Sequence, residues 1–130
     1  MRRRPLRGGR AARLGELLPL HALPAAHRHG RLGVRADRAR LLVTQGEELI
    51  RAYDPGGGGF TKLFCSACGS ALWSRHPDDH NVISIRLGAF DGDPGIRPSY
   101  RQFVAHAAPW ELIPDDGLPR YPEGRPAVGT

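Results

Sequence analysis

The chain contains two cysteines, Cys65 and Cys68, which are separated by two residues and followed by Gly69. A two-residue spacer lets both sulfurs converge on one metal ion, and glycine after the second cysteine tolerates the tight backbone geometry of such a turn. A pair of soft thiolates suits Zn²⁺, which normally takes four nitrogen or sulfur ligands in a closed structural site. The spacing therefore predicts that Cys65 and Cys68 are metal ligands and form half of a zinc site.

Two other interpretations of the cysteine pair stay open. A redox dithiol of the thioredoxin type would need a strand-helix-strand setting, and the flanking pattern is that of strands only. The two thiols would otherwise be small apolar side chains packed in a turn. The remaining ligands of a metal site could be histidines, because His27 and His29 lie upstream with His21 and would allow a mixed Cys2His2 site; solvent-exposed histidines are the alternative.

The part of the chain that carries the cysteines has the pattern of an all-β domain. Short apolar or alternating runs recur at a spacing of roughly ten residues and are separated by Gly, Pro, Asp and Asn. In the longest run, Ile83, Ile85 and Leu87 share one face, which is the period of a half-buried strand. The predicted strands cover residues 41–44, 48–53, 60–65, 71–76, 81–90, 99–106 and 110–114.

Charge and composition divide the chain near residue 34. The whole chain of 130 residues carries a net charge of +6. Residues 1–40 have a charge balance of +9, whereas residues 41–130 have a balance of −3. We therefore expect an irregular Arg- and Ala-rich segment over 1–33, disordered or out of frame, one β domain over 34–122, and a flexible Pro- and Gly-rich tail over 123–130.

The same distribution narrows the classes of partner. A mildly acidic folded part argues against a nucleic-acid partner, and no apolar run reaches the roughly 18–20 residues of a membrane span. Two thiols at this spacing, after an N-terminus that makes a poor signal peptide, favour a reducing, cytoplasmic compartment. No feature of the sequence indicates the oligomeric state.

Several spaced motifs carry a family resemblance. The stretch "GFTKLFCSACGSALW" is followed by a G-x-x-D element, a P-G-I-R-P turn, A-P-W and D-G-L-P, in that order. From about residue 40 to 122 the chain resembles the C-terminal part of the glutathione-dependent formaldehyde-activating enzyme family, the group that includes centromere protein V. The resemblance implies an Mss4-like β-tent domain and a zinc-binding carbon-sulfur lyase that acts on glutathione-type thiol adducts such as S-hydroxymethylglutathione.

The resemblance also implies which half of the metal site is present. In that family the C-x-x-C pair, here Cys65 and Cys68, completes a structural zinc with an upstream C-x-C, and a further upstream C-x-C-x-x-C carries the zinc assigned to catalysis. The region that should hold the second motif, near residues 17–22, has no thiol. Either the front end is out of frame, which translation of the other two frames would test, or the chain is a degenerate member and a non-catalytic binding module.

A few other features have both a chemical and a plain interpretation. The stretch "DPGGGGF" lacks the Lys-Ser/Thr of a phosphate loop and predicts a hairpin connection. "HPDDH" and the pair Asp91 and Asp93 are typical of turns, although either could touch a metal or do acid-base work. Arg86, Arg97 and Arg101 could hold the carboxylates of a glutathione-like substrate, ordinary exposed arginine being the alternative.

Overall fold

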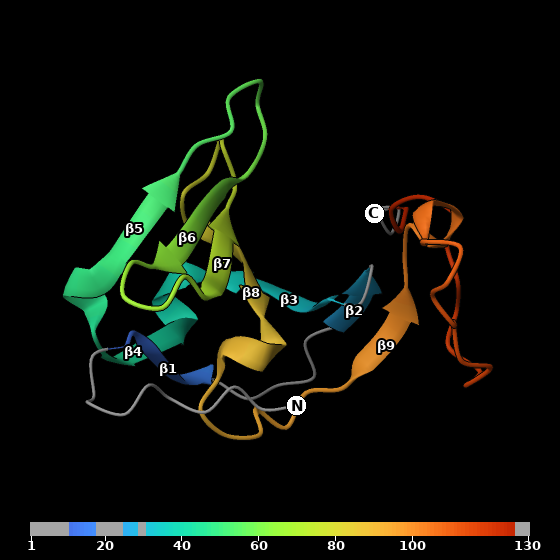
Figure 1. Cartoon of the computed structure of the whole chain (residues 1–130), viewed down its shortest axis with the longest axis horizontal. Helices are drawn as coiled ribbons and strands as arrows, with labels where there is room; N and C mark the ends of the chain where they lie inside the picture. Colours follow the sequence, from blue (N-terminus) through green and yellow to red (C-terminus); the bar gives the residue numbers. More distant parts are fainter. Residues whose placement is uncertain (1–10, 18–24, 29–30, 127–130) are drawn as a thin grey trace.

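A computed structural model describes residues 11–17, 25–28 and 31–126 of the chain (Figure 1). Every regular element in these residues is a strand or a single turn of 3-10 helix, so the predicted all-β class is confirmed. The strands are β1 (Arg13–Leu17), β2 (Ala25–Arg28), β3 (Arg31–Asp37), β4 (Leu41–Gln45), β5 (Ile50–Tyr53), β6 (Thr61–Cys65), β7 (Ala71–Arg75), β8 (Val82–Arg86) and β9 (Pro98–Arg101). The 3-10 turns are η1 (Arg38–Arg40), η2 (Glu47–Leu49), η3 (Leu87–Ala89) and η4 (Val104–His106).

The strands form one large sheet and one small sheet. The large sheet has the order β5-β6-β7-β8-β3-β2-β9, and the small sheet pairs β1 with β4. Neighbours in the large sheet are antiparallel except β2 and β9, which run parallel. In Figure 1, β9 and the segment after it lie at the opposite end of the molecule from β5 and β6. Within the described residues, no helix is long and apolar enough to span a membrane.

The hydrophobic core begins on one face of the large sheet. A cross-strand row runs through Leu63 in β6, Trp73 in β7, Ile85 in β8 and Val34 in β3, and all four side chains are buried. Side chains on directly opposed residues of adjacent strands lie on the same face, which is why these positions pack together. Leu14 from β1 and Leu41 from β4 belong to the same buried cluster, so the small sheet contributes to the same core.

The N-terminal region differs from the irregular segment expected there. Its described part contributes β1, β2 and the start of β3, and β3 runs across the predicted boundary at residue 34. Val34 and Ala36 are buried whereas Arg35 and Asp37 are exposed, the alternation of a strand with one face on the core. Strand β1 has little alternation of its own and depends on pairing with β4, which lies far along the chain. The predicted domain boundaries themselves stay predictions.

One predicted strand is wrong. Residues 110–114 form a turn and irregular chain, with Trp110 84% exposed and Leu112 92% exposed. Pro109 precedes this run and Pro114 is its last residue, and neither has an N–H to give to a sheet, so an apolar pattern alone does not make it a strand. The strand expected over 99–106 also ends early, because β9 stops at Arg101 and Phe103 adopts a left-handed conformation, with φ 56°, before η4.

The segment after β9 is held by an ion pair between the buried Arg101 and the exposed Asp116. The Arg101 guanidinium donates a hydrogen bond of 2.6 Å to Asp116, and the Arg101 side chain is 8% exposed. This hydrogen bond holds the pKa of the Asp116 carboxyl below its usual value. Backbone bonds from Arg101 N to Pro119 O and from Phe103 N to Glu123 O continue the connection into the chain's last described residues.

Replacing Asp116 with asparagine should lower the melting temperature at neutral pH, and the loss should shrink in acid. A carboxyl whose pKa is lower in the folded than in the unfolded protein stabilises the fold above its unfolded pKa, and this contribution disappears as the pH falls through the folded pKa. Thermal melts at pH 7 and at pH values below about 4, the ordinary range of this carboxyl, measure the effect. Asp115→Asn is the matched control; an equal, pH-independent loss in both variants would contradict the assignment.

Candidate functional site

The two cysteines lie at the turn between β6 and β7. Cys65 is the last residue of β6, and the turn that follows is closed by hydrogen bonds from Gly69 N to Cys65 O and from Cys65 N to Ser70 O, at 2.7 and 3.0 Å. Gly69 has a φ of 75°, a left-handed conformation that favours glycine. Ser66 anchors the turn to η2, because its N–H and hydroxyl both donate to the carbonyl of Leu49.

The two thiols have different environments. The Cys65 residue is 0% exposed and its sulfur accepts a 3.4 Å hydrogen bond from the backbone N–H of Ala12. Cys68 is exposed, and its thiol donates to the Ser70 hydroxyl at 3.2 Å. Burial raises the pKa of the Cys65 thiol, but hydrogen bonds from the backbone of Ala12, Cys68 and Ala67 and from the Cys68 side chain outweigh it. The pKa of Cys65 therefore lies below its ordinary value.

These contacts fit two ligands of a thiolate metal site. Backbone N–H groups that point at a sulfur stabilise its anionic form, which is the form that binds metal. The hydrogen bonds from the Ala67 and Cys68 backbone, inside the turn, and from the Cys68 side chain all reach the Cys65 sulfur. The turn thus offers two sulfurs with the chemistry of metal ligands, and their role in metal binding stays a prediction.

The rest of a closed zinc site is not found in the described residues. Among the side chains that the structure describes, no three His, Cys, Asp or Glu gather closely enough to hold a metal ion. A structural Zn²⁺ normally has four protein ligands. The described part of the chain therefore lacks a complete set of four zinc ligands, although Cys65 and Cys68 could supply two of them.

The structure separates one of the candidate histidines from the cysteines. His27 lies in β2, whose backbone pairs it with Leu32 in β3 and Arg101 in β9. Four strand spacings separate β2 from β6 in the sheet, a distance of about 19 Å at the usual spacing of neighbouring strands. The backbone of His27 therefore lies four strands from the strand that ends at Cys65. His21 and His29 lie outside the described residues.

The residue that sequence reasoning missed is Ala12. The left-handed Gly46 lies against this segment, where an added Cβ would come within 2.6 Å of the Ala11 carbonyl oxygen and 2.8 Å of the Ala12 nitrogen. This close approach brings Ala12 to the Cys65 sulfur, so the front end of the chain does reach the thiol turn. An alanine carries no chemical signal, and only the fold could reveal its position.

Three of the other polar candidates accept hydrogen bonds within turns. Asp54 accepts a bond from Gly56 N in the predicted hairpin connection, and Asp79 accepts one from Asn81 N in the "HPDDH" turn. Asp93 accepts bonds from Gly95 N and from the Arg97 guanidinium, each at 2.8 Å. Their turn interpretation is confirmed.

The two thiols should differ sharply in reactivity. Cys68 is exposed whereas Cys65 is fully buried, so iodoacetamide should alkylate Cys68 at least about tenfold faster, because Cys65 reacts only after a local opening. Mass spectrometry of the peptide after a timed reaction measures the two rates. Equal rates, or faster modification of Cys65, would contradict this arrangement of the turn.

Comparisons with known proteins agree with the motifs. Residues 29–106 match the model of a family described as glutathione-dependent formaldehyde-activating enzyme. Among solved structures, the chain is similar to a Rhodobacter sphaeroides protein at 17% sequence identity and a TM-score of 0.49, over 87% of this chain and 97% of that one. A comparison with curated proteins finds no match. The family match covers more than half of the chain and includes β3 to η4 with both cysteines, so the chain belongs to the glutathione-dependent formaldehyde-activating enzyme family.

Proposed function

We propose that this chain is a carbon-sulfur lyase that acts on glutathione-type thiol adducts. In one direction the thiol sulfur adds to the carbonyl carbon of formaldehyde, a carbon-sulfur bond forms, and the thiol proton ends on the oxygen. The reverse reaction breaks that bond and returns the proton to sulfur. The observation that carries the proposal is the family match over residues 29–106, which includes the organised thiol turn.

Cys65 and Cys68 are the residues that we assign to the metal. Their sulfurs would hold Zn²⁺ from one side, with the Cys65 thiolate stabilised by backbone N–H groups. A bound zinc ion would supply a Lewis acid close to a thiol or thiohemiacetal group. The burial of Cys65 fixes one sulfur rigidly, whereas the exposed Cys68 lies where a ligand can approach.

A specific observation favours a second candidate function. The described side chains offer two candidate metal ligands where a closed site needs four, which would suit a binding module that keeps the sheet and lacks the chemistry. Such a module would bind a thiol adduct and leave its rate of formation and cleavage unchanged.

A rate measurement separates the two functions. Formaldehyde and glutathione exchange with their adduct, and NMR measures the rate of this exchange. The rate should be higher with the zinc-loaded chain than without protein. Cys68→Ser should lose at least about tenfold of the catalysed rate, because it removes a metal ligand from the surface. An unchanged circular dichroism spectrum would show that this variant folds. Binding of the adduct with no catalysed exchange would establish the non-catalytic module instead.

A further inference from the structure

The segment after β9 adds no residue to the hydrophobic core formed by the described residues. We call residues 102–126 the arm, and none of these described residues is buried. Backbone hydrogen bonds join parts of the arm to each other and to β9, for example from Phe103 N to Glu123 O and from Tyr121 N to Arg101 O. Figure 1 places the arm at the opposite end of the molecule from β5 and β6. The arm is therefore a projection that is held by its own contacts and by β9.

Two large apolar side chains of the arm lie in solvent. Trp110 is 84% exposed and Leu112 is 92% exposed, whereas the other exposed large apolar side chains, Leu42 and Tyr53, are exposed by 46% and 59%. Tryptophan is enriched at the centre of protein interfaces, because burial of its ring removes a large apolar area from water. An arm that carries the two most exposed apolar side chains of the described residues therefore has the character of a docking element.

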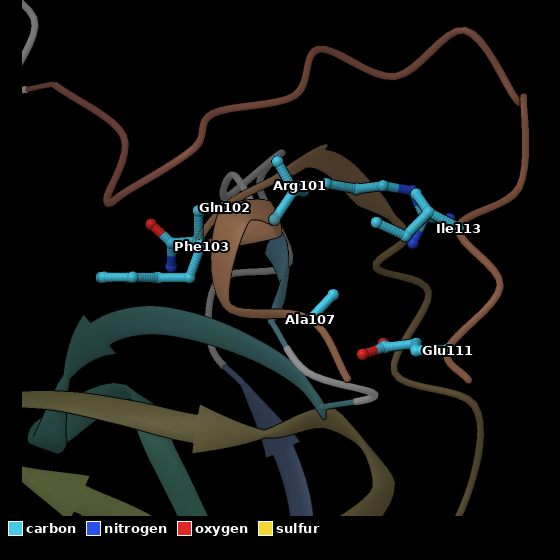
Figure 2. A pocket seen from close by; sticks show the side chains of 7 residues that line it. Arg101, Gln102, Phe103, Ala107, Glu111 and Ile113 are labelled. Carbon is cyan, nitrogen blue, oxygen red and sulfur yellow. The ribbon is translucent and has the colours of Figure 1, made fainter. Parts of the chain in front are cut away.

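The same stretch of the arm is acidic. Residues 107–119 contain no Lys or Arg and three acidic residues, Glu111, Asp115 and Asp116. Asp116 is paired with Arg101, but the side chains of Glu111 and Asp115 make no hydrogen bond or ion pair with any described residue. Figure 2 shows the Glu111 carboxylate directed toward Ala107, not toward Arg101. A surface that receives this stretch should therefore be basic and should also offer an apolar contact.

The large sheet has such a surface on the face away from its core. Next to the buried row, a second cross-strand row runs through Tyr53 in β5, Lys62 in β6, Ser74 in β7, Ser84 in β8 and Arg35 in β3. Successive residues of a strand point to opposite faces, so this row lies on the face that we call the outer face. Tyr53, Lys62 and Arg35 are exposed there.

Cations outnumber acids on the outer face. Arg51 and Arg86 lie on it as well, because each is two residues from a member of the row. The only acid in β3 and β5 to β8 is Asp37, against the four cations Arg35, Arg51, Lys62 and Arg86. Arg35 makes no hydrogen bond or ion pair with a described residue, and Arg51 donates to two backbone carbonyls. The outer face therefore keeps positive charge for an acidic partner.

The arm and the outer face complement each other in charge and in apolar character. We propose that the chain forms a two-fold symmetric dimer in which the arm of each copy lies on the outer face of the other. Trp110 packs on Tyr53, and Glu111 faces Lys62. A two-fold arrangement closes because both copies use both surfaces, whereas one-way docking would continue into an open chain.

Sedimentation equilibrium of the full-length chain measures this association. The wild type should be in a monomer-dimer equilibrium in the micromolar range, so dilute solutions contain the monomer. Trp110→Ala should weaken the dimer at least about tenfold, the usual loss for a central aromatic residue of an interface. Leu42→Ala is the matched control, because it truncates an exposed side chain of the small sheet and should leave the dissociation constant unchanged.

A charge exchange tests which surfaces meet. Glu111→Lys and Lys62→Glu should each weaken the dimer, and the double variant should recover most of the affinity, because it restores the pair with its charges exchanged. Circular dichroism spectra like that of the wild type would show that the variants fold. A monomeric wild type, equal losses in Trp110→Ala and Leu42→Ala, or a double variant without recovery would overturn the proposal. A monomer that binds single-stranded DNA through Arg35 and Lys62 would assign the outer face to a nucleic acid instead. The measurement involves neither zinc nor turnover, so its result is independent of the lyase assay.

Discussion

Replacing Ile85 with alanine should lower the free energy of unfolding by about 2–5 kcal/mol, the usual cost of truncating a buried isoleucine. Ile85 is 0% exposed and lies in the central cross-strand row, opposite Trp73 on one side and Val34 on the other. The variant leaves a cavity between strands that cannot collapse without breaking their register. Urea unfolding monitored by tryptophan fluorescence measures the change.

Two further variants make this result interpretable. Ile85→Val removes one methyl group and should cost about 0.5–1.5 kcal/mol, so the series should follow the volume removed. Leu112→Ala truncates a side chain that is 92% exposed and should change stability by less than about 0.5 kcal/mol. Similar losses for Ile85→Ala and Leu112→Ala would contradict the position of the core.

Replacing Ala12 with cysteine should tighten zinc binding about a hundredfold. Four-ligand structural zinc sites bind with about 10–16 kcal/mol near neutral pH, which is roughly 3 kcal/mol for each ligand. Ala12 N lies 3.4 Å from the Cys65 sulfur, so a thiol at position 12 starts next to the existing pair and becomes a third ligand. Competition with a chromophoric chelator under reducing conditions measures the affinity.

The matched control is a cysteine placed elsewhere. Ala105 is an exposed alanine in η4, at the end of the molecule away from the thiol turn, and Ala105→Cys should leave the zinc affinity unchanged (Figure 1). If both variants tighten binding equally, the effect comes from an added thiol and not from its position. If Ala12→Cys has no effect, residue 12 does not lie where the structure places it.

The local pattern predicted most of the sheet from residue 41 onward. Strands β5 to β8 fall within the expected runs and β4 extends one residue beyond its run, and Ile83, Ile85 and Leu87 are all buried as the alternation indicated. These strands are joined by short connections rich in Gly, Pro and Asp, so each signal is local. The pairing of β1 with β4 and of β2 with β9 is not local, and no pattern within the strands themselves specifies it.

The sequence predicted the roles of some residues of the candidate site and not of others. The C-x-x-C-G spacing identified the thiol turn, because a metal corner requires those residue types at that interval. Nothing in the sequence indicated that Ala12 contacts Cys65, or that His27 lies four strands away from it. Arg101 was one of three candidate arginines, and only its burial and unpaired Nε distinguish it from an ordinary exposed side chain. Whether residues 1–33 are in frame stays a prediction.

The most direct test of the thiol turn as a metal corner is the zinc content of the full-length, tag-free chain. After incubation with excess Zn²⁺, native mass spectrometry should find one zinc per wild-type chain. Cys65→Ala/Cys68→Ala should carry none while its circular dichroism spectrum stays that of the wild type. A wild-type chain without zinc at saturating concentration, or a double variant that keeps its zinc, would contradict the account.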